Sequence, residues 1–179
     1  MAGLKELRTR IETIKSTEKI TSAMKMVAAA RLRRSPGLIE KCRFYNNNIL
    51  ASANRVLFEL RQEEQKKNVR FVYPELMRGS GKAENYLLLV FTSDRGLCGS
   101  YNSNVAREAS KRIEELLGGG KNVKILCIGK KGRDILKRKY AGMIVDTIEG
   151  IARKGAKYYE AVDLGQRVLD MNAKGEFDV

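Results

Sequence analysis

The chain has 179 residues, 35 of them lysine or arginine and 21 aspartate or glutamate, which gives a formal net charge of +14. This length suffices for one or two domains with a hydrophobic core. The sequence contains no histidine, so histidine general bases and histidine metal ligands are excluded within it. No apolar run approaches the roughly 18 residues that a membrane-spanning helix requires.

The first 35 residues predict a long amphipathic helix. They contain no proline and a single glycine, Gly3. Four large apolar residues recur at spacings of three, four and three residues, which places them on one helical face. They are Leu4, Leu7, Ile11 and Ile14. The first 34 residues also carry nine basic and three acidic side chains. No segment in the next hundred residues matches the apolar stripe, so we expect a basic rod that fits into another component.

A proline interrupts the helical pattern directly after this rod. Pro36 lacks an N–H group and its ring collides with the carbonyl four residues earlier, so the sequence predicts a kink or a break at residues 35–37, with Ser35 as the cap of the next helix. A second helical stripe then runs to the charged residues 63–67. Its apolar positions are Leu38, Cys42, Tyr45, Ile49, Val56 and Leu60. Both a continuation of the rod and a helix folded against a sheet fit this pattern.

From residue 86 the pattern changes to alternating strands and helices. Apolar runs predict three strands, at residues 87–91, 123–128 and 143–148. The first of these runs is typical of a strand that is buried on both faces. Helices are predicted at residues 105–117 with Asn104 as the cap, at 131–139 and at 158–172. This order implies right-handed crossovers, and hence an α/β fold with a Rossmann-like parallel sheet and flanking helices.

The domain organisation follows from these elements. We expect a long helical segment at residues 1–67, a connection at 68–85 with a short extended piece at 69–73, and a globular α/β domain at 86–179. Phe177, Asp178 and Val179 are expected to open a fourth strand. Because an edge strand needs its length to pair, we expect this domain to be truncated at that strand.

The remaining chemistry points away from catalysis. Cys42, Cys98 and Cys127 form no C-x-x-C pair, which favours a reducing compartment, and we expect all three to be small buried apolar residues. No serine or cysteine has a histidine base, and Glu114 and Glu115 are adjacent and face different ways. We therefore expect no catalytic residue and no metal site.

The loop after the first predicted strand lies where doubly wound sheets bind phosphates. Its glycines, Gly96 and Gly99, do not form the G-x-G-x-x-G fingerprint, so we interpret it as a tight turn. Asp94 and Arg95 are expected to form a local ion pair there. The run at residues 118–121 precedes a strand and lacks the Ser or Thr of a P-loop, and it is also interpreted as a turn.

Two motifs in this sequence resemble the gamma subunit of F-type ATP synthase. The first begins with Lys5-Glu6-Leu7-Arg8 and Ile11 and continues through residues 17–34, from Thr17-Glu18-Lys19-Ile20 to Arg33-Arg34. The second is a signature loop that follows Ser93. It consists of Asp94, Arg95, Gly96, Leu97, Cys98 and Gly99. Both motifs occur in the order of that family, and the resemblance covers most of the chain.

The resemblance implies a function for the rod. The first helix would be half of an antiparallel coiled coil, with Leu4, Leu7, Ile11 and Ile14 on its paired face, and the terminal helix that pairs with it is expected to be missing here. The chain would be the non-catalytic central rotor shaft, which transmits torque between a proton-driven membrane rotor ring and the catalytic ring. Residues expected to contact that ring are Met24, Lys25, Met26, Arg31, Arg33 and Arg34.

The partners implied by the resemblance are the alpha and beta subunits of the catalytic ring, the epsilon subunit and the membrane rotor ring. No cofactor, no nucleic acid and no directly bound small molecule are implied. The implied location is peripheral, on the cytoplasmic face of a bacterial inner membrane or, as an alternative, on the matrix side of the mitochondrial membrane.

Two alternatives belong to other classes of protein. A nucleotide-binding, Rossmann-like enzyme would bind ATP without any partner. A basic nucleic-acid-binding protein would account for the net charge, although the rod lacks the interleaved aromatic residues of a single-strand platform.

Overall fold

The computed structural model describes residues 2–71, 81–151 and 157–179. The chain divides into two compact units, residues 1–71 and residues 72–179, and each is described by itself. The predicted connection falls partly on residues 72–80, which lie outside the described residues. Among the helices of the described part, none is long and apolar enough to cross a membrane.

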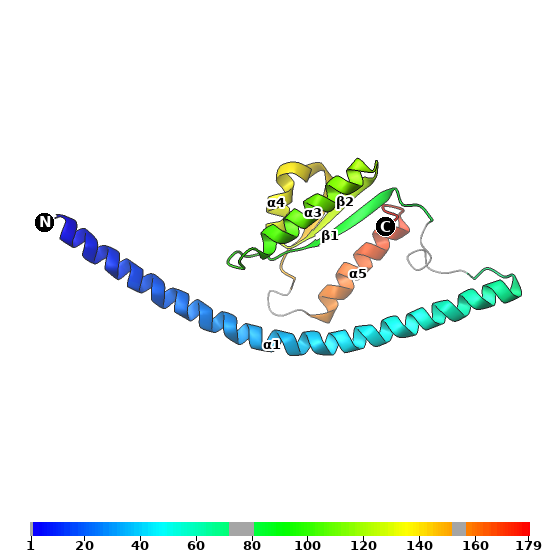
Figure 1. Ribbon diagram of the computed structural model, residues 1–179, viewed down its shortest axis with the longest axis horizontal. Helices are drawn as coiled ribbons and strands as arrows, with labels where there is room; N and C mark the ends of the chain where they lie inside the picture. Colours follow the sequence, from blue (N-terminus) through cyan, green and yellow to red (C-terminus); the bar gives the residue numbers. More distant parts are fainter. Residues whose placement is uncertain (1, 72–80, 152–156) are drawn as a thin grey trace. The chain divides into compact units, whose positions relative to one another are not determined.

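Helix α1 (Ala2–Lys67) makes up almost the whole first unit and contains 66 residues. It is unbroken and includes Pro36, so the predicted break at residues 35–37 is wrong and no new helix begins there for Ser35 to cap. The proline costs the helix one hydrogen bond, to the carbonyl of Leu32, while the turns on both sides keep theirs. Figure 1 shows α1 as a single, gently curved helix. The second apolar stripe therefore continues the rod.

The apolar stripe of α1 is exposed along its length. Leu4, Leu7, Ile11 and Ile14 are 68%, 57%, 51% and 61% exposed. Large apolar residues of the second stripe, such as Ile49 and Val56, are also exposed. Burying one such side chain is worth about 1.5–3 kcal/mol. A helix that leaves a row of them in water has a surface suited to a partner.

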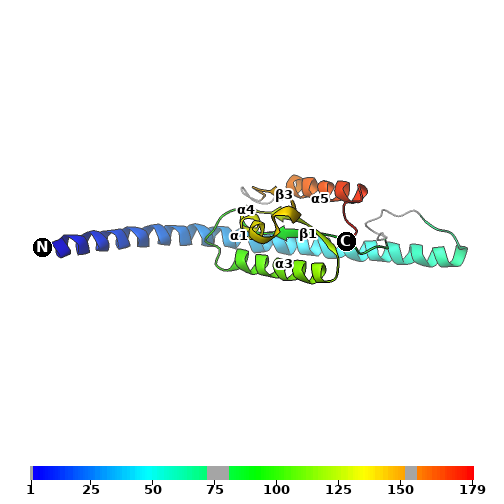
Figure 2. The ribbon, with the colours of Figure 1, turned by 90° about the horizontal axis from the view of Figure 1, so that it is seen from above.

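The second unit contains a parallel sheet with helices on its two faces, as Figures 1 and 2 show. Its three strands have the order β1-β2-β3, and they are β1 (Asn85–Phe91), β2 (Asn122–Ile128) and β3 (Ile144–Ile148). Its helical elements are α3 (Tyr101–Gly118), α4 (Lys130–Tyr140), the short η1 (Ala141–Met143) and α5 (Tyr158–Ala173). Helices α3 and α4 lie on one side of the sheet and α5 on the other. The predicted α/β fold with a parallel sheet is confirmed.

The start of α3 differs from the prediction. The helix begins at Tyr101 and its N-cap is Ser100, so Asn104 lies within the first turn and does not cap it. The Asn104 side chain instead donates a hydrogen bond of 3.1 Å to the Ser100 hydroxyl. The apolar spacing missed this first turn because its residues, apart from Tyr101, are polar.

The core lies between the sheet and the helices α3 and α4. Central strand β2 contributes Val123, Ile125 and Cys127 to this side, and Leu126 and Ile128 are buried on the other. Strand β1 differs from the prediction, because Leu89 and Phe91 are 40% and 49% exposed on the α5 side. The strand that is buried on both faces is therefore β2, the middle one. A continuous apolar run cannot distinguish a central strand from one beside it.

Residues Phe177–Val179 lie along the outer edge of β1. The Leu87 N–H donates to the Val179 carbonyl at 2.8 Å, and the Val179 N–H donates to the Asn85 carbonyl at 3.2 Å. These two bonds, on either side of Tyr86, are the pattern of a parallel pair. Phe177 is buried beneath this edge. The hydrogen bonds of the expected fourth strand thus begin here, although the segment is too short to be assigned as one.

The Asp178 carboxylate holds this segment in place. It accepts hydrogen bonds from the backbone N–H groups of Asn85, at 2.9 Å, and Glu84, at 3.2 Å. The bond from the Asn85 backbone is the main reason that the pKa of Asp178 lies below its usual value of 3.8. The contribution of the carboxylate to stability is therefore present above pH 3.8 and is lost as the pH falls through the lowered pKa.

Acidification is expected to release residues 177–179 from β1. Amide hydrogen exchange at Leu87 measures this directly, and its protection factor should fall as the pH drops through the pKa of Asp178. In Asp178→Asn, which does not titrate, the protection should already be low at neutral pH and should change less on acidification. Equal pH profiles for the two proteins would show that another carboxyl group controls the edge.

Candidate functional site

The loop after β1, residues 92–100, is organised by the side chain of Asn102, which is 8% exposed. Its Oδ1 accepts a hydrogen bond of 2.9 Å from the Ser93 backbone N–H. Its Nδ2 donates to Ser93 Oγ at 2.8 Å and to Cys98 Sγ at 3.0 Å. One buried amide on the first turn of α3 therefore fixes both ends of the signature loop.

The tip of the signature loop has an uncommon backbone. Leu97 has φ of +62° and Gly99 has φ of +60°. A left-handed backbone is ordinary for glycine but uncommon for leucine, and Leu97 is also 89% exposed. The tight-turn interpretation is thus confirmed at Gly99. The network around Asn102 holds the tip in this shape, so the leucine side chain projects from a preformed turn.

Asp94 connects the carboxyl ends of the strands. Its Oδ1 accepts a hydrogen bond of 3.1 Å from the N–H of Lys130, and its Oδ2 accepts one of 2.9 Å from the N–H of Gly150. Among the described residues it makes no ion pair with Arg95, so the expected local pair is wrong. The carboxylate instead satisfies two backbone donors that are far away in the sequence. Lys130 is the first residue of α4, and the N-terminus of a helix is where a nucleotide site binds phosphate. In this protein the Asp94 carboxylate already occupies that position.

Thr92 fills the space next to Asp94. Its Oγ1 accepts a hydrogen bond of 2.8 Å from the N–H of Gly132. Gly129 has φ of +106°, and a Cβ there would lie 2.1 Å from the Thr92 carbonyl oxygen. A Cβ at Gly132 would lie 2.7 Å from Thr92 Oγ1. The carboxyl edge of the sheet is therefore closed by contacts within the protein, and both glycines are required by close approach.

The ring-contact residues expected from the resemblance lie in the first half of α1. Met24 and Met26 are 48% and 66% exposed, and Lys25 and Arg33 are also exposed. The side chains of Arg31 and Arg34 lie outside the described residues. Consecutive helical residues are about 100° apart around the axis, so Met24, Lys25 and Met26 face three directions. One flat surface cannot contact all three.

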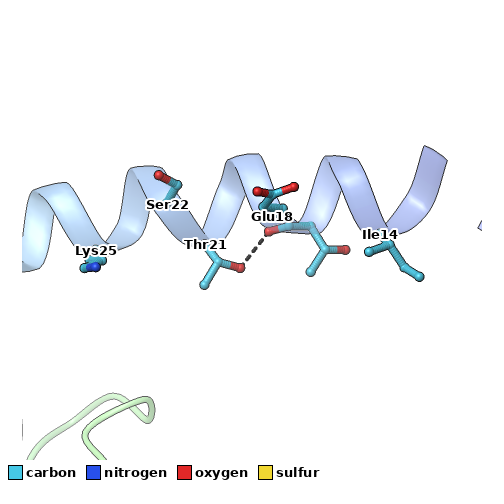
Figure 3. A pocket seen from close by; sticks show the side chains of 6 residues that line it. Ile14, Glu18, Thr21, Ser22 and Lys25 are labelled. Atoms are coloured by element: carbon cyan, nitrogen blue, oxygen red, sulfur yellow. Dashed lines mark hydrogen bonds between the residues drawn. The ribbon is translucent and has the colours of Figure 1, made fainter. Parts of the chain in front are cut away.

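A shallow hollow on α1 is lined by Lys25 but by neither methionine. Its lining residues are Ile14, Thr17, Glu18, Thr21, Ser22 and Lys25. Figure 3 shows these side chains along the helix, with a dashed line for the hydrogen bond that the Thr21 hydroxyl donates to the Thr17 carbonyl. This bond is 2.6 Å long. Lys25 thus shares a face with Ile14 of the apolar stripe.

Two charged clusters flank the α/β core. Lys139 pairs with Glu114, which also accepts a hydrogen bond of 3.1 Å from the Tyr140 hydroxyl, and the Lys139 bond in particular lowers the pKa of Glu114. Arg133 pairs with Asp134 at 3.0 Å and lowers the pKa of that carboxyl. Both clusters lie on the surface, where solvent screens ion pairs and they contribute little to stability. The pair of Lys139 and Glu114 joins α4 to α3, whereas Arg133 and Asp134 are neighbours on α4.

The cysteines are only partly as expected. Cys127 is fully buried, and burial raises the pKa of its thiol. Cys98 is half-buried in the signature loop. Cys42 is exposed, so its expected burial is wrong, because it lies on the continuous helix α1 and not in a core. Within the described residues no group of cysteine and acidic side chains is arranged to hold a metal ion.

The first unit is a long helix with an exposed apolar face, and the second is an α/β unit whose sheet edge is closed by its own side chains. These two features together are typical of a subunit of a larger assembly. The family model described as ATP synthase matches residues 3–179, and the chain belongs to this family. The resemblance to gamma subunits is confirmed by the relatives.

These relatives are bacterial proteins named ATP synthase gamma chain. The chain is 41% identical to the one from Sinorhizobium medicae and 44% identical to the one from Gluconacetobacter diazotrophicus. Each match covers all of this chain and 59% of the relative, so the chain spans about three fifths of their length. Among solved structures, the central stalk and c-ring of the Tetrahymena thermophila mitochondrial ATP synthase matches with a TM-score of 0.56 and 29% identity. That match covers 83% of this chain and 58% of the other.

Sequence reasoning missed Asn102 and Thr92. Neither residue belongs to the signature loop, and both act through hydrogen bonds to backbone groups that are distant in the sequence. A polar residue in the first turn of a helix, directly after a glycine-containing loop, is the available signal for Asn102. Thr92 gives no such signal, because threonine at a strand end is common.

Removing the Asp94 carboxylate is expected to destabilise the α/β unit. In Asp94→Ala the N–H groups of Lys130 and Gly150 lose their acceptor, which is worth about 1–3 kcal/mol. Urea unfolding of the chain measures the change. Asp163→Ala removes an exposed carboxylate on α5 and should change the free energy of unfolding by about 0.5 kcal/mol or less. Equal effects of the two substitutions would contradict the bridging role.

Proposed function

We propose that this chain forms the central rotor shaft of an F-type ATP synthase and carries torque between a membrane rotor ring and a catalytic ring of alpha and beta subunits. The observation that carries the proposal is α1, an unbroken helix of 66 residues with an exposed apolar stripe. The names of the relatives support it. The chain itself performs no catalysis and binds no cofactor in this proposal.

The physical basis of the coupling is unequal contact. An asymmetric shaft can bias a catalytic subunit only if it interacts differently with the subunit's open and closed forms. Met24 and Met26 supply flexible apolar contacts on different sides of α1, and Arg31, Arg33 and Arg34 supply positive charge for acidic loops of the ring. Exposed ion pairs are worth about 1 kcal/mol or less, so such contacts guide the shaft without locking it.

The proposed partners are the alpha and beta subunits, the epsilon subunit and the membrane rotor ring. The similar Tetrahymena structure comprises the central stalk together with the c-ring, which supports the last of these partners. The proposed location is the cytoplasmic face of a bacterial inner membrane, since the relatives compared above are bacterial. The mitochondrial matrix side is the alternative.

Leu7→Glu is expected to impair shaft assembly, because it places a carboxylate in the apolar stripe, where burial without a partner costs several kcal/mol. The intact polypeptide should be reconstituted with alpha and beta subunits, and ATP-driven proton pumping should be measured in vesicles. Thr9→Glu adds the same group at a similar height on the opposite side of α1 and should pump normally. Normal assembly and pumping by Leu7→Glu would refute the helix pairing.

The chain is expected to bind no ATP by itself. Asp94 occupies the start of α4, and the contacts of Gly129 with Thr92 close the sheet edge. Titration calorimetry of the 179-residue chain with magnesium and ATP should give no binding heat. Micromolar affinity would contradict the shaft assignment and favour the nucleotide-binding enzyme.

A further inference from the structure

A seam with a period of 3.5 residues runs along α1 far beyond its first four apolar residues. Continuing the alternating steps of three and four from Leu4 leads to Leu60 without a change of phase across Pro36. The apolar members of this seam are Leu4, Leu7, Ile11, Ile14, Ala28, Leu32, Ile39, Cys42, Ile49, Ala53, Val56 and Leu60. A period of 3.5 is that of a left-handed coiled coil, so one partner helix can follow the seam through this whole length.

Only two charged residues lie in this seam, Glu18 and Lys25. They are one heptad apart, about 10 Å along the axis, with Thr21 between them. All three line the hollow of Figure 3, together with the seam residue Ile14. The charged interruption therefore lies on the paired face and is a single block, bounded by Ile14 on one side and Ala28 on the other, whereas the other polar residues of the seam, Ser35 and Asn46, are uncharged.

The two charges have no partner within the described part of α1 or elsewhere in the described chain. Neither Glu18 nor Lys25 forms a hydrogen bond or an ion pair with another described residue, and both are exposed. Thr21 is different, because its hydroxyl is satisfied by the Thr17 carbonyl. A helix packed on this seam would cover both charges, and covered charges are tolerated only when they are paired.

We infer that Glu18 and Lys25 form a polar layer that sets the register of the helix packed on α1. The occupant to which we commit is a helix with a cationic or amide side chain opposite Glu18 and a carboxylate opposite Lys25. Apolar layers alone would allow this helix to shift by a heptad at little cost, whereas a shift would leave both charges facing apolar groups. This inference rests on the proposed shaft function and assigns Lys25 to helix pairing instead of to the catalytic ring.

The test exchanges the two charges while keeping the net charge. In Glu18→Lys/Lys25→Glu the new carboxylate at position 25 should face a carboxylate on the partner helix, and the new lysine at position 18 should face a cation or an amide that no longer pairs with it. The yield of assembled complex should therefore fall roughly tenfold. The matched control is Glu12→Lys/Lys19→Glu, the same exchange with the same spacing on the other side of α1, and its yield should be unchanged. Both are made in the intact polypeptide and assembled with alpha and beta subunits.

A second pair of substitutions tests register directly. Glu18→Leu/Lys25→Leu should assemble at least as well as the parent, but a photo-crosslinking residue in place of Lys15, beside the seam, should now label partner positions a heptad apart. The parent should label one position. A single labelled position in both proteins would overturn the register role.

The remaining outcomes separate this inference from the proposed function. Equal yields from the exchange and its control, with Leu7→Glu still defective, would overturn the polar layer and leave the shaft pairing intact. Normal assembly of all three variants would overturn the pairing itself. Cross-links from position 15 to alpha or beta subunits instead of to a helix would return Lys25 to the catalytic ring and also overturn the layer.

Discussion

The structure depends on apolar surface that α1 cannot bury against itself. A single continuous helix cannot fold back to bury its own apolar stripe. The stripe of α1, which has 66 residues, is therefore exposed to water until another element covers it. Burial of exposed side chains such as Leu4 and Ile14 would supply the free energy that binds a partner. Under the proposed function, assembly supplies the element that covers this stripe.

The α/β unit, in contrast, buries its apolar surface within itself. Its sheet buries a core against α3 and α4, and its carboxyl edge, where related architectures leave room for ligands, is occupied by Asp94, Thr92 and the backbone around Gly129. These contacts tie three strand ends together and leave no phosphate position at α4. The unit thus has the shape of a binding fold but uses its binding edge for internal cohesion.

The sequence predicted the strands and the longer helices because those elements have strong apolar periodicity. The sequence-based predictions were wrong where contacts with the rest of the structure, and not the residue itself, decide its conformation or its partners. Pro36 was expected to kink or break the helix, but α1 is unbroken, because a single missing hydrogen bond is a small loss among many intact turns. The exposure of Leu89 and Phe91 on β1 was missed because neighbouring elements, and not the strand itself, decide burial. Asp94 was assigned to Arg95 since its real donors are distant in the chain and become neighbours only when the parallel strands align.

The contact between Gly129 and Thr92 has a consequence for mutational tolerance. Because the carbonyl oxygen of Thr92 lies 2.1 Å from where any β-carbon at position 129 would be, every non-glycine residue is excluded there by backbone, which cannot move aside as a side chain can. In deep mutational scanning of the whole chain, position 129 should tolerate no substitution. Position 118 should accept many residues, because no atom lies within 4 Å of the place where a β-carbon of Gly118 would be.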